Sequence, residues 1–294
     1  MNYYDEIKNE LLNNEITKRV KDYSKNRNDL NTYYNVGKML SEADKHYGEG
    51  IIKEYSKRLT EELGKGYSTT RLRYIRRFYE ISKKCPSVTD VFTYTHYCEL
   101  IWFDDYDKIN YYINVSVEQN LSIRQLRQRI KSNEYERLVG NTKLKLIKKE
   151  ESSVVDFVKN PILIRSSYNY DEVSEKILKK LILEDLDNFL KELGNNFCYI
   201  GNEYKIKIGD RYNYIDLLLY NIEFNCYVVV ELKVTELKKE YIGQIQIYMN
   251  YIDNNLKKIN QDKTVGIIIC KKDNKYVIEY CSDNRIIARE YEFM

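Results

Sequence analysis

Residues 212–251, YNYIDLLLYNIEFNCYVVVELKVTELKKEYIGQIQIYMNY, decide the fold of this chain. They contain two runs of apolar, β-branched and aromatic residues, at 212–220 and 226–232. A short polar connection joins the two runs, which predicts neighbouring strands of a hairpin. Both runs are apolar enough to lie inside a sheet.

Three charged residues interrupt these predicted strands. Asp216 lies in the middle of the first strand, and Glu231 and Lys233 lie at the end of the second. Glu231 and Lys233 share a face because strand side chains repeat every two residues. A buried carboxylate is costly unless it is paired or coordinates a cation. Two carboxylates on neighbouring strands therefore indicate a divalent metal site, with a solvated Glu231–Lys233 ion pair as the alternative.

A hard ion such as Mg²⁺ suits this arrangement, because it needs only one or two protein carboxylates besides water and substrate phosphate. Such a metal activates a water, and Lys233 would neutralise charge on the phosphate or orient the nucleophile. An Asp followed by Glu-x-Lys at a strand end is the signature of the PD-(D/E)XK nuclease superfamily. The surrounding segments IDLLLYN (215–221), VVVELK (228–233) and GQIQIYMNYID (243–253) resemble the nuclease domain of the YhcG family.

This resemblance implies a metal-dependent DNA endonuclease with Mg²⁺ or Mn²⁺ as its cofactor. Asp216 and Glu231 would be metal ligands together with the Leu232 carbonyl, and Lys233 would be the catalytic lysine. Gln244 matches a helix glutamine that contacts substrate or metal-bound water, although the residue type alone fits a surface position equally well. The resemblance further implies branched or foreign DNA, from phages or mobile elements, as candidate substrates, and a homodimer as the assembly.

One position departs from the family pattern. The family's first helix usually presents a glutamate to the site, and the aligned residue here is Lys179. Glu175 lies one turn earlier and Glu184 five residues later, so either replaces that glutamate only with a change of register. Two carboxylates instead of three favour an alternative, a degenerate nuclease-fold protein that binds DNA or a protein partner without cleaving.

The length and charge distribution predict two domains. The chain has 294 residues, enough for two modest cores. Residues 1–150 carry a net charge of +6 and the remainder −3, which suits a binding domain joined to a metal-dependent one. We expect a helical, basic DNA-binding domain at 1–140, a linker at 141–153 and a PD-(D/E)XK nuclease domain at 154–294.

The predicted fold class is α+β with two domains, an all-α, helix-turn-helix-like N-terminal domain and a C-terminal α/β restriction-endonuclease-like domain. The C-terminal pattern gives an αβββαβ core: a helix at 171–193, strands at 197–208, 212–220 and 226–232, a helix at 240–256 and a strand at 264–270. Two short strand-like stretches, near 276–280 and 286–288, close the chain.

Two basic helices in the N-terminal half predict contact with DNA. An amphipathic helix at 51–63 stops at two glycines, and an arginine-rich helix capped by Ser68 or Thr69 follows, as in a helix-turn-helix. A second basic helix begins after Ser122. Solvated helix faces, or arginines that pack against acidic residues of a structural adaptor, are the alternatives. The candidate phosphate-contacting residues are Arg71, Arg73, Arg76, Arg77, Arg124, Arg127, Arg129 and Lys131.

The remaining composition predicts a cytoplasmic protein. Six cysteines lie far apart, several within apolar runs, as expected for reduced core residues. The N-terminus is too charged for a signal peptide, and no apolar run approaches the ~20 residues of a membrane span.

Overall fold

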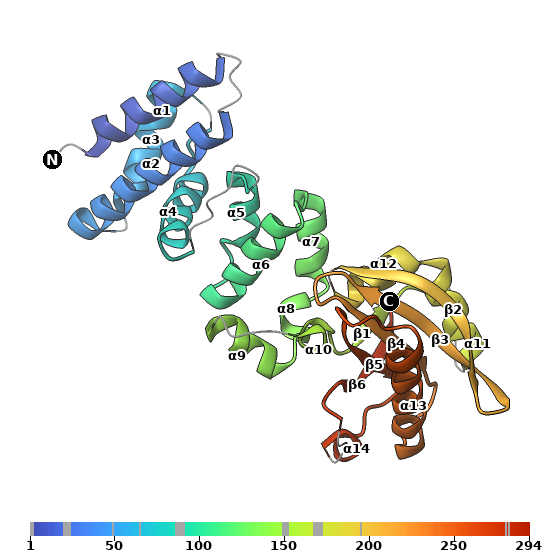
Figure 1. The fold of residues 1–294 in the computed structure, drawn as a ribbon. Helices are drawn as coiled ribbons and strands as arrows, with labels where there is room; N and C mark the ends of the chain where they lie inside the picture. Colours follow the sequence, from blue (N-terminus) through green and yellow to red (C-terminus); the bar gives the residue numbers. More distant parts are fainter. Residues whose placement is uncertain are drawn as a thin grey trace. The chain divides into compact units, whose positions relative to one another are not determined.

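A computed structural model describes the chain over 3–19, 25–48, 50–64, 66–85, 92–148, 153–166, 173–194, 196–279, 281 and 283–294. It divides into two compact units, Met1–Tyr135 and Glu136–Met294 (Figure 1).

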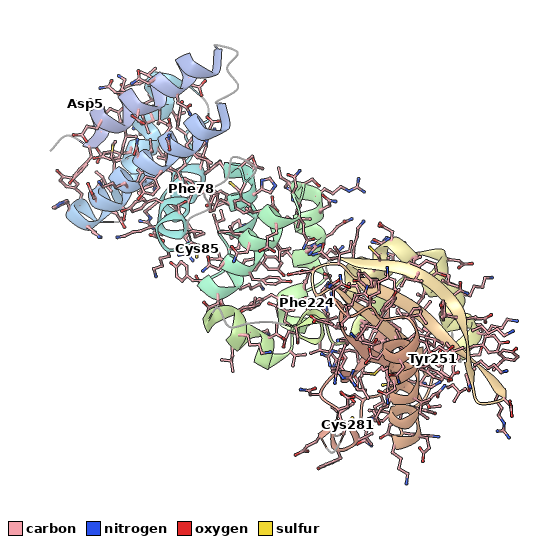
Figure 2. All side chains as sticks on the ribbon, viewed as in Figure 1. Asp5, Phe78, Cys85, Phe224, Tyr251 and Cys281 are labelled. Atoms are coloured by element: carbon pink, nitrogen blue, oxygen red, sulfur yellow. The ribbon has the colours of Figure 1, made fainter. Side chains whose placement is uncertain are left out.

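The first unit is helical, as predicted. Its buried side chains include Phe78, whose ring packs edge-on against Tyr94 and Tyr97 (Figure 2). Its helices are α1 (Tyr3–Arg19), α2 (Lys25–Tyr47), α3 (Gly50–Leu63), α4 (Thr69–Lys84), α5 (Tyr94–Leu100), α6 (Tyr106–Glu118), α7 (Ile123–Lys131) and the start of α8 (Glu134–Arg137).

Side-chain caps fix where the two basic helices begin. The Ser68 hydroxyl accepts the backbone N–H of Arg71 at the start of α4. Ser122 and Gln125 form a reciprocal capping box at the start of α7. Both caps satisfy backbone donors that have no partner within the helix. The predicted caps at Ser68 and Ser122 are therefore confirmed.

The second unit is a mixed sheet with helices on both faces. Its described strands follow the order β1-β6-β5-β4-β3-β2. β2, β3 and β4 are antiparallel neighbours, whereas β4, β5, β6 and β1 pair in parallel. The elements are α9 (Gly140–Lys148), α10 (Val154–Phe157), β1 (Ile162–Ile164), α11 (Glu175–Glu184), α12 (Leu186–Leu193), β2 (Phe197–Ile208), β3 (Arg211–Asn221), β4 (Cys226–Leu232), α13 (Lys239–Asn255), β5 (Asp262–Cys270), α14 (Lys275–Glu279) and β6 (Ile286–Phe293).

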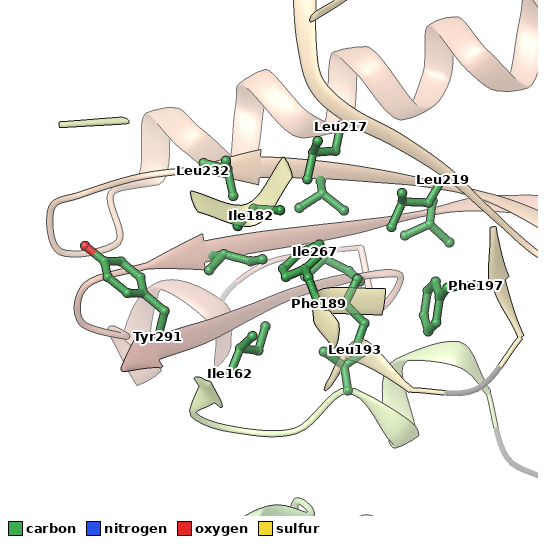
Figure 3. Close-up of a cluster of buried hydrophobic side chains, with 14 of the residues drawn as sticks. Ile162, Ile182, Phe189, Leu193, Phe197, Leu217, Leu219, Leu232, Ile267 and Tyr291 are labelled. Atoms are coloured by element: carbon green, nitrogen blue, oxygen red, sulfur yellow. The ribbon is translucent and has the colours of Figure 1, made fainter. Parts of the chain in front are cut away.

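Alternating residues of β4 supply two cores, one on each face of the sheet. Val228 and Val230 pack with α11 and α12 in the cluster of Figure 3, whereas Val229 packs with α13 on the other face. On that second face, a Cβ added to Gly266 of β5 would lie 2.6 Å from the Met249 Sδ of α13. Glycine therefore permits the close approach of α13 to the sheet. This three-layer arrangement confirms the predicted αβββαβ core.

The single helix predicted at 171–193 is wrong, because the structure has two helices there. α11 ends at Glu184 and α12 begins at Leu186, because Asp185 between them has φ −128° and ψ 48°, outside the helical region. The positions 171–172 lie outside the described residues. The helical period continues across the break in sequence, so the pattern alone does not reveal it.

The end of the chain also differs from expectation. The stretch near 276–280 was expected to be a strand, but α14 is helical there. The strand expected at 286–288 extends to Phe293 as β6, and the short strand β1 pairs with it in parallel. β1 has three residues, which is too few for a periodic signal.

The expected linker contains a folded helix. In α9, the Thr142 hydroxyl donates to the Asp156 carbonyl at 2.7 Å, and the Lys145 Nζ lies 2.8 Å from the Asp156 carboxylate of α10. These contacts attach α9 to the second unit, and the division between the units falls after Tyr135. The lysine-rich composition of α9 is typical of a linker, and the contacts that fold this segment are not visible in the sequence.

None of the described helices combines the length and apolar character needed to cross a membrane. All six cysteines are free thiols. Cys85, Cys226 and Cys270 are buried as expected, but Cys198 is exposed on β2.

Candidate active site

The middle of β3 and the end of β4 bring Asp216, Glu231 and Lys233 together. Leu217 pairs with Val230 across the two strands, so Asp216 and Glu231 occupy adjacent positions of the ladder. The backbone N–H of Leu232 donates to Asp216 Oδ2 at 3.0 Å. This bond fixes the aspartate against the end of β4.

Glu231 is the most buried carboxylate of this group, with 2% of its surface exposed. Its Oε2 accepts a hydrogen bond from Lys233 Nζ at 3.3 Å. Its Oε1 is buried and has no hydrogen-bond partner among the described residues. Burial, reinforced by the negative charge of Asp216, raises the pKa of Glu231 to about 7 despite the opposing charge of Lys233.

Lys233 remains a charged ammonium although only 8% of the residue is exposed. Burial lowers its pKa, but the negative charges of Glu231, Glu175 and Asp216 outweigh that effect and raise the pKa overall. The Nζ lies 3.9 Å from Glu175 Oε1 and 5.1 Å from the centre of the Tyr241 ring. The lysine thus has acidic neighbours from both the sheet and α11.

Lys179 of α11 reaches directly into the group. Its Nζ lies 2.8 Å from Asp216 Oδ1 and 3.3 Å from Glu203 Oε1. Burial lowers the pKa of Lys179, but its bonds to these two carboxylates raise the pKa overall, so it too is cationic. An ammonium therefore occupies the position where a glutamate was expected from the family pattern.

The two candidate replacements for that glutamate differ in position. Glu175 lies one turn before Lys179 on α11, and its Oε1 lies 3.9 Å from Lys233 Nζ. Glu184 instead pairs with Lys180 at 3.7 Å, where both side chains are largely exposed. Glu175 is thus the acidic residue that α11 contributes to this site.

Glu203 is a member of the group that sequence patterns do not reveal. It lies opposite Asp216, between the β2–β3 pairs Asn202–Leu217 and Tyr204–Ile215. Its φ of 47° falls in the left-handed region, which is uncommon for a residue other than glycine. Residues two positions apart on a strand normally face the same side of the sheet. Ile215 and Leu217 instead face opposite sides, because Ile215 packs with α13 and Leu217 with α11, so the alternation of β3 changes at Asp216.

Gln244 lies on α13, half-buried, and its Nε2 donates to the Tyr248 hydroxyl at 3.1 Å. This is a contact within one helix, between residues four positions apart. No described contact joins Gln244 to Asp216, Glu231 or Lys233.

The donor atoms fit a hard divalent cation with few protein ligands. Among the described residues, no group of three or more His, Cys, Asp and Glu side chains is placed to hold a metal. Asp216 and Glu231 nevertheless supply two neighbouring carboxylates, and Glu231 Oε1 has lone pairs that no described donor satisfies. Mg²⁺ requires no more protein ligands than these, because it keeps several waters. Lys179 competes with such an ion for Asp216.

Comparison with known proteins identifies relatives of both halves of the chain. Residues 155–294 match the model of the YhcG PDDEXK nuclease domain, and residues 10–137 match the DUF1016 N-terminal domain. The chain is 24% identical over 308 residues to "Putative nuclease YhcG" of Escherichia coli (strain K12), covering 89% of this chain and 82% of that protein. The chain is a distant homologue of YhcG. The segment of this chain that matches the PDDEXK nuclease domain, residues 155–294, contains the whole carboxylate–lysine group described above.

Two solved structures also match the chain, at 18% identity and a TM-score of 0.29. One is a repair endonuclease from Pyrococcus abyssi, and the match covers 44% of this chain and 49% of that structure. The other is an EndoMS–dsDNA complex, with coverage of 44% and 48%. The chain thus spans about half the length of these structures.

In the DUF1016 N-terminal domain, three of the predicted DNA-contacting arginines have internal partners. Arg71 donates to the Gly66 carbonyl at 3.0 Å and to the Tyr33 hydroxyl at 3.1 Å. Arg76 pairs with Asp44 at 2.5 Å. Arg77 donates to the Phe103 carbonyl at 2.7 Å and to the carboxylate of Glu80 at 3.1 Å.

The basic helix α7 has similar internal pairs. Arg127 donates two hydrogen bonds to Glu99, at 2.8 and 2.7 Å. Arg129 pairs with Glu134 at 2.9 Å and donates to Gln119. These arginines connect elements of their own unit. Arg73, Arg124 and Lys131 differ, since they are exposed and form no ion pair with any other described residue.

Proposed function

We propose that this protein is a metal-dependent DNA endonuclease that hydrolyses phosphodiester bonds. The observation that carries the proposal is the group where the end of β4 meets the middle of β3. Asp216, Glu231 and Lys233 meet there, and a buried oxygen of Glu231 has no described hydrogen-bond partner. Buried polar atoms without partners are uncommon, and a bound ion or water is one source of the partner for such an atom.

Asp216, Glu231 and the Leu232 carbonyl are the proposed ligands of Mg²⁺ or Mn²⁺. When bound, such an ion supplies a water of lowered pKa and positive charge opposite the phosphate. Lys233, kept cationic by its acidic neighbours, donates to a phosphate oxygen and stabilises the charge that develops there. Gln244 on α13 is the proposed contact to substrate or to the attacking water.

DNA is the proposed partner of both units. In the N-terminal unit, the exposed Arg73, Arg124 and Lys131 are the best-placed phosphate contacts, because the other predicted arginines have internal partners. A homodimer is the proposed assembly for cutting both strands of a duplex. Branched DNA and foreign DNA are the proposed substrate classes.

Cleavage of a DNA panel tests the proposal. The full chain is incubated with linear, supercoiled and four-way-junction DNA in Mg²⁺, Mn²⁺ or EDTA, in parallel with Asp216→Ala and Lys233→Ala. Lys258→Ala is the matched control, since Lys258 is an exposed lysine of the same unit. We expect metal-dependent cleavage that falls by roughly 10²–10³-fold in each site variant and is unchanged in the control. Cleavage that survives both site variants contradicts the assignment.

A non-cleaving protein of the same fold is the second candidate, and the Lys179–Asp216 ion pair favours it. At 2.8 Å, the ammonium already neutralises the carboxylate that a metal requires. This candidate predicts no cleavage of any substrate, together with DNA binding that weakens as salt increases. Absence of both cleavage and DNA binding contradicts a role on DNA and leaves the non-cleaving protein that binds a protein partner.

A further inference from the structure

The strands β2 and β3 form a long ribbon that extends beyond the rest of the sheet (Figure 1). Pairing continues from the strand ends at Ile208 and Arg211 back to the base of the sheet. A two-residue turn closes the ribbon, and Gly209 adopts the positive φ of 58° that this turn requires. The ribbon is thus an ordered arm of the nuclease domain.

One face of this arm is held by the core. Ile206 and Ile215 are buried in the cluster on the α13 side, and Tyr204 and Ile208 pack against that cluster. This apolar support orients the arm. The opposite face is therefore presented in a fixed direction.

That opposite face is basic and aromatic. Lys205 pairs with Tyr214 and Lys207 with Tyr212 across the ribbon, and residues directly opposite in an antiparallel pair project to the same side. The Lys205 Nζ lies 3.8 Å from the centre of the Tyr212 ring. Both lysines are exposed, as are the tyrosines, at 57% for Tyr212 and 54% for Tyr214. We call these four residues the arm strip.

The arm strip leads to the candidate active site. Tyr214 precedes Asp216 by two positions on β3, and Lys205 follows Glu203 by two positions on β2. Asp216 and Glu203 both contact Lys179 of α11. Surface aromatics beside lysines suit nucleic acid, because the cation neutralises phosphate and the ring stacks on a base or donates its hydroxyl.

We propose that the arm strip binds the DNA substrate on one side of the bond that is cut. This proposal rests on the proposed function and adds the path of the substrate. Asp216 lies four positions after Tyr212, a span of about 13 Å along a strand. At about 3.4 Å per base pair, the strip follows roughly four base pairs beside the cleavage point.

Equilibrium binding of the full chain to a fluorescent DNA duplex tests the strip, with EDTA present to prevent metal-dependent cleavage. The double variant Lys205→Ala/Lys207→Ala is compared with Lys258→Ala/Lys263→Ala. The control pair removes the same charge, and Lys263 lies at the end of β5 opposite to the site. Tyr212→Ala/Tyr214→Ala is compared with Tyr276→Ala, and thermal unfolding checks that each variant is folded.

We expect the lysine pair to weaken binding roughly tenfold at low salt and to reduce the slope of log affinity against log salt by about 1.8, or about 0.9 per phosphate contact. We expect the tyrosine pair to weaken binding without changing that slope. The corresponding Tyr→Phe variants separate stacking, which they retain, from a hydroxyl contact, which they lose. The control variants should match the wild type.

If the arm variants bind DNA with the same affinity as their control variants, the arm strip does not bind DNA, and the proposed function remains intact. Arm variants that instead lose binding to polyglutamate, with unchanged DNA affinity, assign the strip to an acidic protein partner. A wild-type chain that neither binds nor cuts DNA overturns the proposed function and the strip together.

Discussion

Charged side chains are used differently in the two units. In the helical unit, Arg77 donates to a backbone carbonyl and Arg127 forms a two-bond pair with Glu99, so their charges have partners. Where the end of β4 meets the middle of β3, a buried oxygen of Glu231 has no described partner, and Lys179 and Lys233 lie close to carboxylates. Buried carboxylate oxygens without a described partner occur in both units, at Asp44 and at Glu231, but Glu231 also lies beside Asp216 and Lys233, and such clusters of perturbed charges are typical of functional sites.

The largest effect should come from Arg77, which tests whether the paired arginines are structural. Arg77→Ala removes donors to Phe103 and Glu80 and should lower the free energy of unfolding by about 1–3 kcal/mol, as measured by urea denaturation. Arg73→Ala, on the same helix but exposed, should change it by less than about 0.5 kcal/mol and instead weaken DNA binding. Equal stability of the two variants would remove the distinction between the two kinds of arginine.

The next effect concerns Lys179, whose ammonium competes with a metal for Asp216. Lys179→Glu replaces that cation with a third carboxylate and should increase Mn²⁺ affinity at least tenfold, or about 1.4 kcal/mol, in calorimetric titrations without DNA. Lys180→Glu is the control, because it makes the same charge change at a side chain that is 74% exposed. If both variants gain affinity equally, net charge explains the effect and the Lys179–Asp216 pair does not.

A third effect is a pH dependence caused by Glu231. Its pKa is raised from 4.5 to about 7 in the folded protein, so over this interval the folded state keeps a proton that the unfolded chain has lost. The contribution of Glu231 to the free energy of unfolding should therefore fall as the pH rises from 4.5 to about 7. Urea denaturation of the wild type and of Glu231→Gln at several pH values measures this contribution. The free energy of unfolding of the wild type, relative to that of the variant, should fall as the pH rises.

Saturating Mg²⁺ sharpens this test. A bound cation favours the ionised carboxylate, so the fall in wild-type stability should shrink when Mg²⁺ is added. Glu231→Gln should show no corresponding change. A difference between wild type and variant that stays constant from pH 5 to pH 8 would show that Glu231 is ionised throughout.

Local patterns predict much of the nuclease domain because strand and helix periods depend on adjacent residues. The predicted strands at 197–208 and 226–232 coincide with β2 and β4, and the cap at Ser122 is formed as expected. Elements of three to five residues, such as β1 and α14, are missed or misassigned, because so few residues show no period. Their form depends on packing with distant segments.

The sequence by itself determined that Asp216 stands in the middle of one strand and that Glu231 and Lys233 stand at the end of its neighbour, because the pleat and a short connection leave few alternatives. Only the tertiary structure decided which charges meet. Lys179 reaches Asp216 across 37 positions of the chain and Arg127 reaches Glu99 across 28. Such pairs depend on how helices pack, and no local pattern encodes the distance between two side chains on separate elements.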